Sequence, residues 1–238
     1  NILMGNLSSS LVLQTVPLSD PFAVLQMIFA GAIISFDIAL GALIISIFYF
    51  ILGGRAFCSW VCPVNIITDS ANYLRRVLKF DEVQKKQPAT RNLRYWLILI
   101  SFIISYFMGV AAFELISPVS MVHRGLIFGL GFGLATMIVI FLFDLFVLKN
   151  GWCGHICPLG GFYSLIGRFS LLRVHHNSEK CTACMKCKVV CPEIQVLHMI
   201  DKSSEPVLQE CTLCARCIEV CEDDALNFEL RNYMKEKK

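Results

Sequence analysis

Eight cysteines in the last quarter of the chain fall into two copies of one spacing pattern. The first run is Cys181-x2-Cys184-x2-Cys187-x3-Cys191 and the second is Cys211-x2-Cys214-x2-Cys217-x3-Cys221. In proteins with two clusters and this spacing, three cysteines of one run and the last cysteine of the other run bind a 4Fe–4S cube. The sequence therefore predicts two cubes. The first takes Cys181, Cys184, Cys187 and Cys221, and the second takes Cys211, Cys214, Cys217 and Cys191.

Disulfide frameworks and zinc knuckles are the alternative uses of closely spaced cysteines. Disulfides need an oxidising compartment, and zinc sites usually consist of isolated C-x2-C pairs. Neither explains two matching runs of four cysteines, so the pattern favours iron–sulfur clusters. The runs differ in one respect, because Pro192 follows Cys191 whereas Glu222 follows Cys221. This difference predicts an altered reduction potential for the cube that Cys221 serves.

The rest of the chain is unusually apolar. Of its 238 residues 56% are hydrophobic and only 16% are charged, and the mean hydropathy is +0.64. The apolar residues gather in long runs, which predicts transmembrane helices over residues 36–52, 94–116 and 125–148, after a short interfacial helix at residues 21–31. The expected fold is an all-α membrane helical bundle followed by a C-terminal ferredoxin-like α+β domain. The net charge of +3 gives no sign of a nucleic-acid partner.

The distribution of basic residues predicts the orientation. The loop over residues 53–94 is rich in Lys and Arg, whereas the turn over residues 117–124 contains one basic residue. By the positive-inside rule the loop and the C-terminal region face the cytoplasm, in a multi-pass protein of the inner membrane. Three spans then place the first residue outside, and we expect a further N-terminal span that makes four in the full-length protein.

A second cysteine pattern occurs once in each of two similar halves. Cys58-x3-Cys62 and Cys153-x3-Cys157 are each followed by proline, and each follows a predicted span. These halves form a predicted membrane domain over residues 1–174, and residues 175–238 form the predicted domain with two 4Fe–4S clusters.

On a helix, cysteines four residues apart share one face. If the two halves meet at an axis along the membrane normal, Cys58, Cys62, Cys153 and Cys157 converge on a third metal site, and a third 4Fe–4S cluster is the sharpest form of this hypothesis. Redox-active dithiols, a docking surface and buried structural thiols are the alternatives. His155 lies inside the second pair and is a further candidate ligand, whereas Trp60 occupies the matching position of the first pair.

Several motifs together resemble a known family. These are residues 5–10 (GNLSSS), 15–21 (TVPLSDP), 57–63 (FCSWVCP) and 151–158 (GWCGHICP), followed by the two cysteine runs. In this order they are similar to the NapH family, the membrane ferredoxin-type quinol dehydrogenase subunits of periplasmic nitrate reductase systems. The paired Cys-x3-Cys-Pro motifs also occur in the nitrous-oxide-reductase regulator NosR and in membrane ferredoxins of copper-oxidase assembly.

The resemblance implies oxidation of membrane quinol, with electrons passing to a periplasmic iron–sulfur partner, NapG, and on to nitrate reductase. Quinol oxidation also releases protons, so a quinol site needs a proton acceptor. The ionisable residues near the outer ends of the predicted spans suggest a quinol site among Glu114, His123 and Arg124, with Asp37 opposite. One alternative function is a copper or metal reductase or maturation factor that uses the paired cysteines. Another is a membrane anchor whose clusters are structural.

Overall fold

The computed structural model describes residues 3–5, 9–12, 16–78, 92–128 and 131–231. Packing divides the chain into two units. The helical unit comprises Asn1–Ile47 and Cys62–Phe162, and the cysteine-rich unit comprises Phe48–Val61 and Tyr163–Lys238. The predicted domain boundary after residue 174 rests on sequence motifs. The packing units do not test it, and it stays a prediction.

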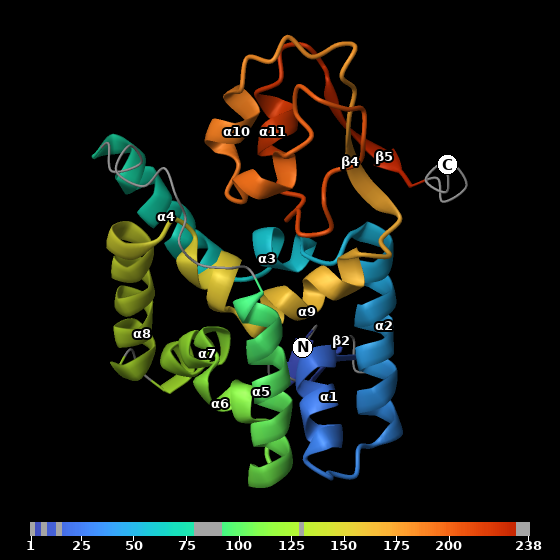
Figure 1. Cartoon of the computed structure of the whole chain (residues 1–238). Coiled ribbons are helices and arrows are strands. Elements are labelled where there is room, and N and C mark those ends of the chain that lie inside the picture. Colours follow the sequence, from blue (N-terminus) through green and yellow to red (C-terminus); the bar gives the residue numbers. More distant parts are fainter. Residues whose placement is uncertain (1–2, 6–8, 13–15, 79–91, 129–130, 232–238) are drawn as a thin grey trace. The chain divides into compact units, whose positions relative to one another are not determined.

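The helical unit begins with a small antiparallel sheet in the order β1-β2-β3. Figure 1 shows the helices of this unit and labels β2 of its sheet. Its strands are β1 (Leu3–Gly5), β2 (Ser9–Val12) and β3 (Val16–Ser19). Helices and two π-helical turns follow. These are α1 (Pro21–Phe29), α2 (Phe36–Leu52), α4 (Val64–Val77), α5 (Leu93–Met108), α6 (Ala112–Ile116), α7 (Pro118–Phe128), α8 (Gly131–Leu142), η2 (Phe143–Val147), η3 (Trp152–Ile156) and α9 (Pro158–Gly167). The last five residues of α2 and the last five of α9 belong to the cysteine-rich unit.

Helix α1 lies in the core of the helical unit. Asp20 caps it, since the Asp20 side chain accepts a hydrogen bond of 3.1 Å from the Phe22 amide, and Pro21 occupies the first turn, where no amide donor is needed. The buried Phe22 ring contacts three other aromatic rings, those of Phe102, Phe113 and Phe162. Helix α1 lies within the predicted interfacial helix. Its first half is buried in the core, whereas Ile28 and Phe29 near its end are exposed, and the interfacial location stays a prediction.

The predicted membrane spans are wrong for the described residues, where no helix combines the length and the apolarity that crossing a bilayer requires. Helix α2 coincides with the first predicted span but has only 17 residues. The second predicted span is interrupted at Gly109, whose left-handed backbone (φ 66°) ends α5. The third is divided into α7, α8 and the π-helical η2. Hydropathy detected the apolar composition of these segments but not the points at which the backbone turns.

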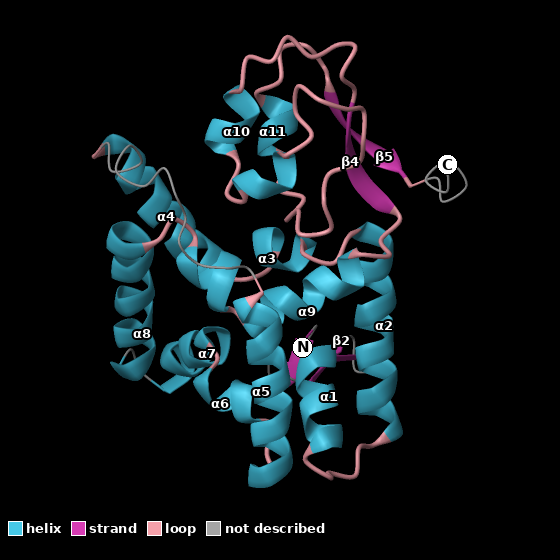
Figure 2. Ribbon diagram, in the orientation of Figure 1, coloured by secondary structure: helices cyan, strands magenta, loops and turns pink. Residues whose placement is uncertain are grey.

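The cysteine-rich unit combines short helices with a two-stranded antiparallel sheet (Figure 2). Its elements are α3 (Ala56–Trp60), β4 (Leu172–His176), α10 (Lys186–Val190), the 3₁₀ helix η4 (Ile194–Leu197), α11 (Arg216–Glu219) and β5 (Leu226–Leu230). Strand β4 pairs with β5 in the register Val174 to Phe228. The hydrophobic core gathers apolar side chains around three of the cysteines: Val174, Val196, Leu197, Met199, Ile200, Val207, Leu213, Leu226, Cys187, Cys191 and Cys217.

Candidate iron–sulfur site

The two cysteine runs fold into matching turns. Ala183 and Leu213, each two residues after the first cysteine of a run, have left-handed backbones with φ of 55° and 54°. Met185 and Ala215 do the same two residues later, with φ of 60° and 63°, and they precede α10 and α11. Such residues curl the chain so that successive amides point into one concave space, which suits a negatively charged group. The sequence repeat is thus also a repeat of backbone structure.

Backbone amides in these turns already point at sulfur. The Ala183 amide donates to Cys181 Sγ and the Leu213 amide donates to Cys211 Sγ, both at 3.4 Å. The Ala225 amide donates to Cys221 Sγ, also at 3.4 Å. Amide hydrogen bonds to cysteine sulfur stabilise the thiolate and are one of the means by which proteins set cluster potentials.

The last cysteine of each run lies close to the other run. A pocket in the cysteine-rich unit is lined by all four cysteines of the predicted second site, Cys191, Cys211, Cys214 and Cys217. The pKa of Cys187 is raised by burial and further by the charges of three neighbours, Cys181, Cys184 and Cys221. The fold therefore gathers the cysteines into the two groups that the spacing predicts, while ligation itself stays a prediction.

Burial disfavours the thiolate form of these cysteines when they carry no metal. It raises the pKa of Cys211 to about 11 and of Cys217 to about 12, and it raises that of Cys191 more strongly. Iron binding would therefore release protons from these thiols. Among the described residues no three His, Cys, Asp or Glu side chains converge as ligands of a single ion. An all-thiolate donor set spread around an apolar pocket instead fits a cube, whose irons bind cysteine at separate corners.

A buried ion pair that sequence reasoning missed lies beside the second group. Arg55, between α2 and α3, is 1% exposed, and its Nη1 lies 2.9 Å from Oε1 of Glu193, which is 4% exposed. The same Nη1 donates to the Glu210 carbonyl oxygen at 2.7 Å. Glu193 and Glu210 adjoin the cysteine runs, but Arg55 is 138 residues from Glu193 in sequence. No periodicity or motif could have indicated this contact.

The second cysteine pattern is divided between the units. Cys58 lies on α3 in the cysteine-rich unit, whereas Cys62, Cys153 and Cys157 belong to the helical unit. Cys153 lies within the π-helical η3, and Cys157 ends it. Their convergence on a third metal site stays a prediction. His155, the further candidate ligand, is 2% exposed.

The four residues of the predicted quinol site lie in the helical unit, in different surroundings. Glu114, on α6, accepts a hydrogen bond of 2.6 Å from the Ser120 hydroxyl. His123 is half-buried on α7, whereas Arg124 and Asp37 are exposed. Asp20 is a buried carboxyl group that sequence reasoning did not include in this site. Burial, together with the Glu114 charge, raises the pKa of Asp20 to about 6.

An apolar pocket of about 480 Å³ adjoins the second Cys-x3-Cys-Pro motif. Ile116 and Pro118 line it from α6 and α7, and Ile140 lines it from α8. Trp152 and Ile156, the residues immediately before Cys153 and Cys157, line another side. The pocket is therefore in the size range of small-molecule sites and contacts a cysteine motif.

Comparison with known proteins identifies the family. The family described as "4Fe-4S binding domain" matches residues 34–81 and again residues 130–175, and the family described as "4Fe-4S dicluster domain" matches residues 173–222. Ferredoxin-type protein NapH of Escherichia coli strain K12 is 41% identical over 235 residues, which cover 97% of this chain and 81% of that protein. The chain belongs to the NapH family of ferredoxin-type proteins.

Other members of this family differ in the pathway that their names give. The methylamine utilization ferredoxin-type protein MauN of Paracoccus denitrificans is 45% identical over 197 residues, covering 82% of this chain and 69% of that protein. MauN of Methylorubrum extorquens is 43% identical over the same length. No solved structure matches the chain. Like NapH and MauN, the chain is a ferredoxin-type electron-transfer protein with 4Fe–4S domains.

Proposed function

We propose that this NapH-family chain oxidises a membrane quinol and delivers the electrons to a periplasmic iron–sulfur partner of the NapG type, which feeds periplasmic nitrate reductase. Each quinol oxidised to quinone releases two electrons and two protons. The observation that carries the proposal is the likeness to NapH, which extends over 97% of the chain. The likeness includes both cysteine patterns and is therefore not confined to a generic ferredoxin module.

Two 4Fe–4S cubes are proposed at the cysteine groups described above, and a third at Cys58, Cys62, Cys153 and Cys157. When bound, such clusters supply one-electron redox chemistry at a potential set by their surroundings. The third cluster is supported by the family match, because the "4Fe-4S binding domain" matches twice and each match includes one Cys-x3-Cys-Pro motif. The protein residues contribute the thiolates, the amides that point at sulfur and the apolar pocket walls.

The quinol ring is proposed to bind in the apolar pocket beside Trp152. Its walls are apolar, as the ring and tail of a quinol require. The proposed proton acceptors are Glu114 on α6 and His123 on α7, each two residues from a residue that lines the pocket, Ile116 and Met121. Arg124 and Asp37, the other two residues proposed for the quinol site, are exposed and do not line this pocket. Asp20, whose pKa the Glu114 charge helps to raise to about 6, is proposed as a second carboxyl group able to hold a proton.

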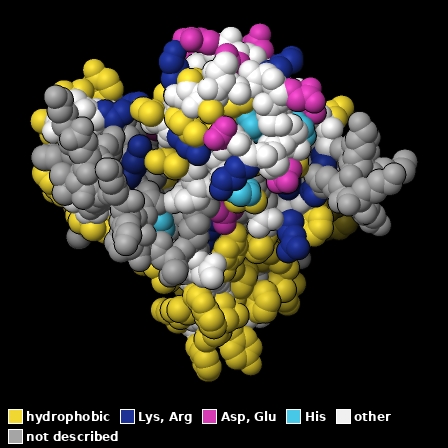
Figure 3. All heavy atoms as spheres, turned by 45° about the horizontal axis from the view of Figure 1, so that its top comes forward, with side chains coloured by type: hydrophobic (Ala, Val, Ile, Leu, Met, Phe, Trp, Pro, Cys, Tyr) yellow, Lys and Arg dark blue, Asp and Glu magenta, His cyan; other side chains and the backbone are white. Residues whose placement is uncertain are grey.

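The surface of the helical unit supports work at the inner membrane. Large hydrophobic side chains such as Phe36, Leu43 and Phe107 are exposed on α2 and α5, and Figure 3 shows a broad hydrophobic surface there. Hydrophobic patches of this extent mark contacts with lipid or with other proteins. We place the cysteine-rich unit in the cytoplasm, where reducing conditions suit thiolate ligands.

The test is reduction of the cluster EPR signals by quinol in membranes that contain the full-length chain. We expect quinol to reduce the wild type. Met121→Trp, which fills the pocket, should slow quinol reduction at least tenfold while leaving reduction by dithionite unchanged. Ile138→Trp is the matched control, because Ile138 is exposed on α8 and does not line the pocket. If dithionite reduces the clusters but quinol does not, the proposal is rejected.

The likeness to MauN favours a second class of partner, in methylamine utilization. The two candidate partners, one of the NapG type and one from methylamine utilization, are purified and each is mixed with the reduced chain. The partner that reoxidises the clusters faster is the productive one.

Metal content tests the other alternative, in which the paired cysteines handle copper. We expect iron and no copper in the wild type, and about four fewer irons in Cys58→Ser/Cys157→Ser. Copper held by the wild type and lost from the variant would favour metal maturation instead.

A further inference from the structure

Segment 53–60, which contains Cys58, packs against the second cysteine group. Three residues of this segment contact residues that lie within two positions of those cysteines in sequence. Arg55 binds Glu193 and the Glu210 carbonyl oxygen, and these residues lie two positions after Cys191 and one before Cys211. Segment 53–60 thus contacts the chain on both sides of the second group, although more than 130 residues separate them in sequence.

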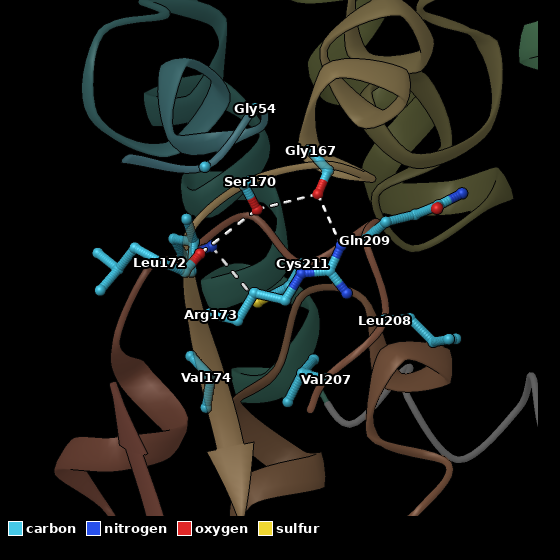
Figure 4. Close-up of a pocket in the computed structure, with 12 residues that line it drawn as sticks. Gly54, Gly167, Ser170, Leu172, Arg173, Val174, Val207, Leu208, Gln209 and Cys211 are labelled. Carbon is cyan, nitrogen blue, oxygen red and sulfur yellow. Dashed lines mark hydrogen bonds between the residues drawn. The ribbon is translucent and has the colours of Figure 1, made fainter. Parts of the chain in front are cut away.

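Trp60 and Gly53 supply the other contacts. Trp60 Nε1 donates a hydrogen bond of 3.2 Å to the carbonyl oxygen of Leu213, which lies between Cys211 and Cys214. Gly53 (φ 114°) packs so tightly against the Leu213 side chain that a Cβ at this position would overlap it. Figure 4 shows Gly54 and Gly167 lining the same narrow pocket as Cys211. The turn that holds two cysteines of the second group is therefore packed directly against segment 53–60.

In the described part of the chain, the ion pair beside the first cysteine group, between Lys186 and Glu222, is exposed rather than buried. Asp223 follows Cys221 by two residues, as Glu193 follows Cys191. The Asp223 carboxylate, however, accepts a hydrogen bond of 3.0 Å from the Thr182 amide and another from the Thr182 hydroxyl, at an exposed position. Glu193 instead pairs with a buried guanidinium. The two groups thus repeat each other in backbone but differ in the charge placed beside them.

A buried ion pair is a weak device for stability, because the cost of removing both charges from water offsets most of their attraction. It is an effective device for fixing a charge in place, because arginine stays charged in any protein environment. Arg55 and Glu193 are both buried, so solvent ions screen their charges little at this position.

We propose that the Arg55–Glu193 pair sets the reduction potential of the second cube, and that segment 53–60 is a structural part of that redox site. This inference rests on the proposed cubes but not on the identity of the electron donor. A reduced cube carries one more negative charge, so a guanidinium beside it favours reduction and a carboxylate opposes it. Glu193 balances Arg55, and removing either partner shifts the potential in a direction that its charge dictates.

The experiment is an EPR-monitored redox titration of the purified full-length holoprotein, poised with chemical reductants and mediators. Glu193→Gln keeps the shape of the side chain and removes its charge, which leaves the guanidinium unbalanced. An unscreened charge within a few ångströms changes a protonation equilibrium at least tenfold. We therefore expect the reduction equilibrium of the second cube to shift at least tenfold toward the reduced form, which corresponds to about 59 mV for one electron.

Two controls accompany Glu193→Gln. Arg55→Lys keeps the positive charge and should leave both potentials near the wild-type values. Asp223→Asn removes the corresponding acid of the first group and should leave the second cube unchanged. The cubes are told apart with Cys184→Ala, which removes a predicted ligand of the first cube alone.

An unchanged second potential in Glu193→Gln with full iron content would overturn the inference. So would loss of one cube from Glu193→Gln while Arg55→Lys retains both, because the pair would then have only a structural role. Because chemical reductants poise the titration, failure of quinol to reduce the protein would reject the proposed function without affecting this result.

Discussion

Asp144 is expected to make the stability of the helical unit depend on pH. Its side chain is fully buried in η2, where Oδ1 accepts a hydrogen bond of 3.0 Å from the Trp152 amide. Burial raises the pKa of Asp144 from 3.8 to about 7, although the hydrogen bonds from the Trp152 and Gly151 amides and the charge of Arg75 act in the opposite direction. The folded chain therefore holds a proton on Asp144 at pH values where the unfolded chain has lost it.

The sign and magnitude follow from linkage. Because the folded-state pKa is the higher one, the contribution of this group is fully present below pH 4 and is lost as the pH rises through 7. One pH unit between the two pKa values changes the free energy of unfolding by about 1.4 kcal/mol. Between pH 5 and pH 8 the wild type should lose about 2.5 kcal/mol through Asp144 alone, of a total of about 4 kcal/mol.

The assay is denaturant unfolding of the full-length protein at pH 5 and pH 8, followed by circular dichroism. Asp144→Asn keeps an oxygen for the Trp152 amide but does not titrate, so we expect it to remove about 2.5 kcal/mol of the difference between the two pH values. Asp37→Asn, at an exposed aspartate, should change that difference by less than about 0.5 kcal/mol. If Asp144→Asn and the wild type lose equal stability between pH 5 and pH 8, the reasoning is refuted.

Three further substitutions test the packing and the cysteine groups. Gly54→Ala places a Cβ against the backbone of α9, so we expect the free energy of unfolding to fall by about 3 kcal/mol, with a lower melting temperature. Gly131→Ala, where the added Cβ meets open space, should leave the melting temperature almost unchanged. Cys191→Ser should alter the same EPR signal as Cys214→Ser, and an effect on the other signal would disprove the crossed pairing. Gln26→Ala leaves a buried amide of α6 and a hydroxyl of α5 without their acceptor, and should cost about 2 kcal/mol in thermal unfolding; an unchanged melting temperature would contradict this.

The sequence predicted the parts of this protein that depend on local spacing. Two matched cysteine runs predicted two matched turns, and the structure brings the predicted groups together, with Cys191 beside the second run and Cys221 beside Cys187. The family resemblance was likewise confirmed by NapH itself. The family was recognisable because cluster-binding motifs restrict residue type and spacing within a few positions, and ligation by these cysteines stays a prediction.

Predictions that depended on long-range structure did less well. The expected spans followed hydropathy, which averages over a window and is insensitive to a single left-handed residue such as Gly109. The Arg55–Glu193 pair was missed because each partner taken alone resembles an ordinary surface charge. The partnership of Asp20 with Glu114 was missed for the same reason, since Asp20 reads in the sequence as a helix cap.

Because segment 48–61 belongs to the cysteine-rich unit, the two cysteine runs cannot be transferred to another protein without it. A C-terminal fragment cut at residue 174 would contain all eight cysteines of the two runs and yet lack Arg55, leaving Glu193 as an unbalanced charge in an apolar interior. Losing one partner of a buried pair costs about 3–5 kcal/mol. Gene fusion or domain exchange that treats the two runs as a self-contained cassette should therefore yield an unstable product unless the acid is replaced at the same time.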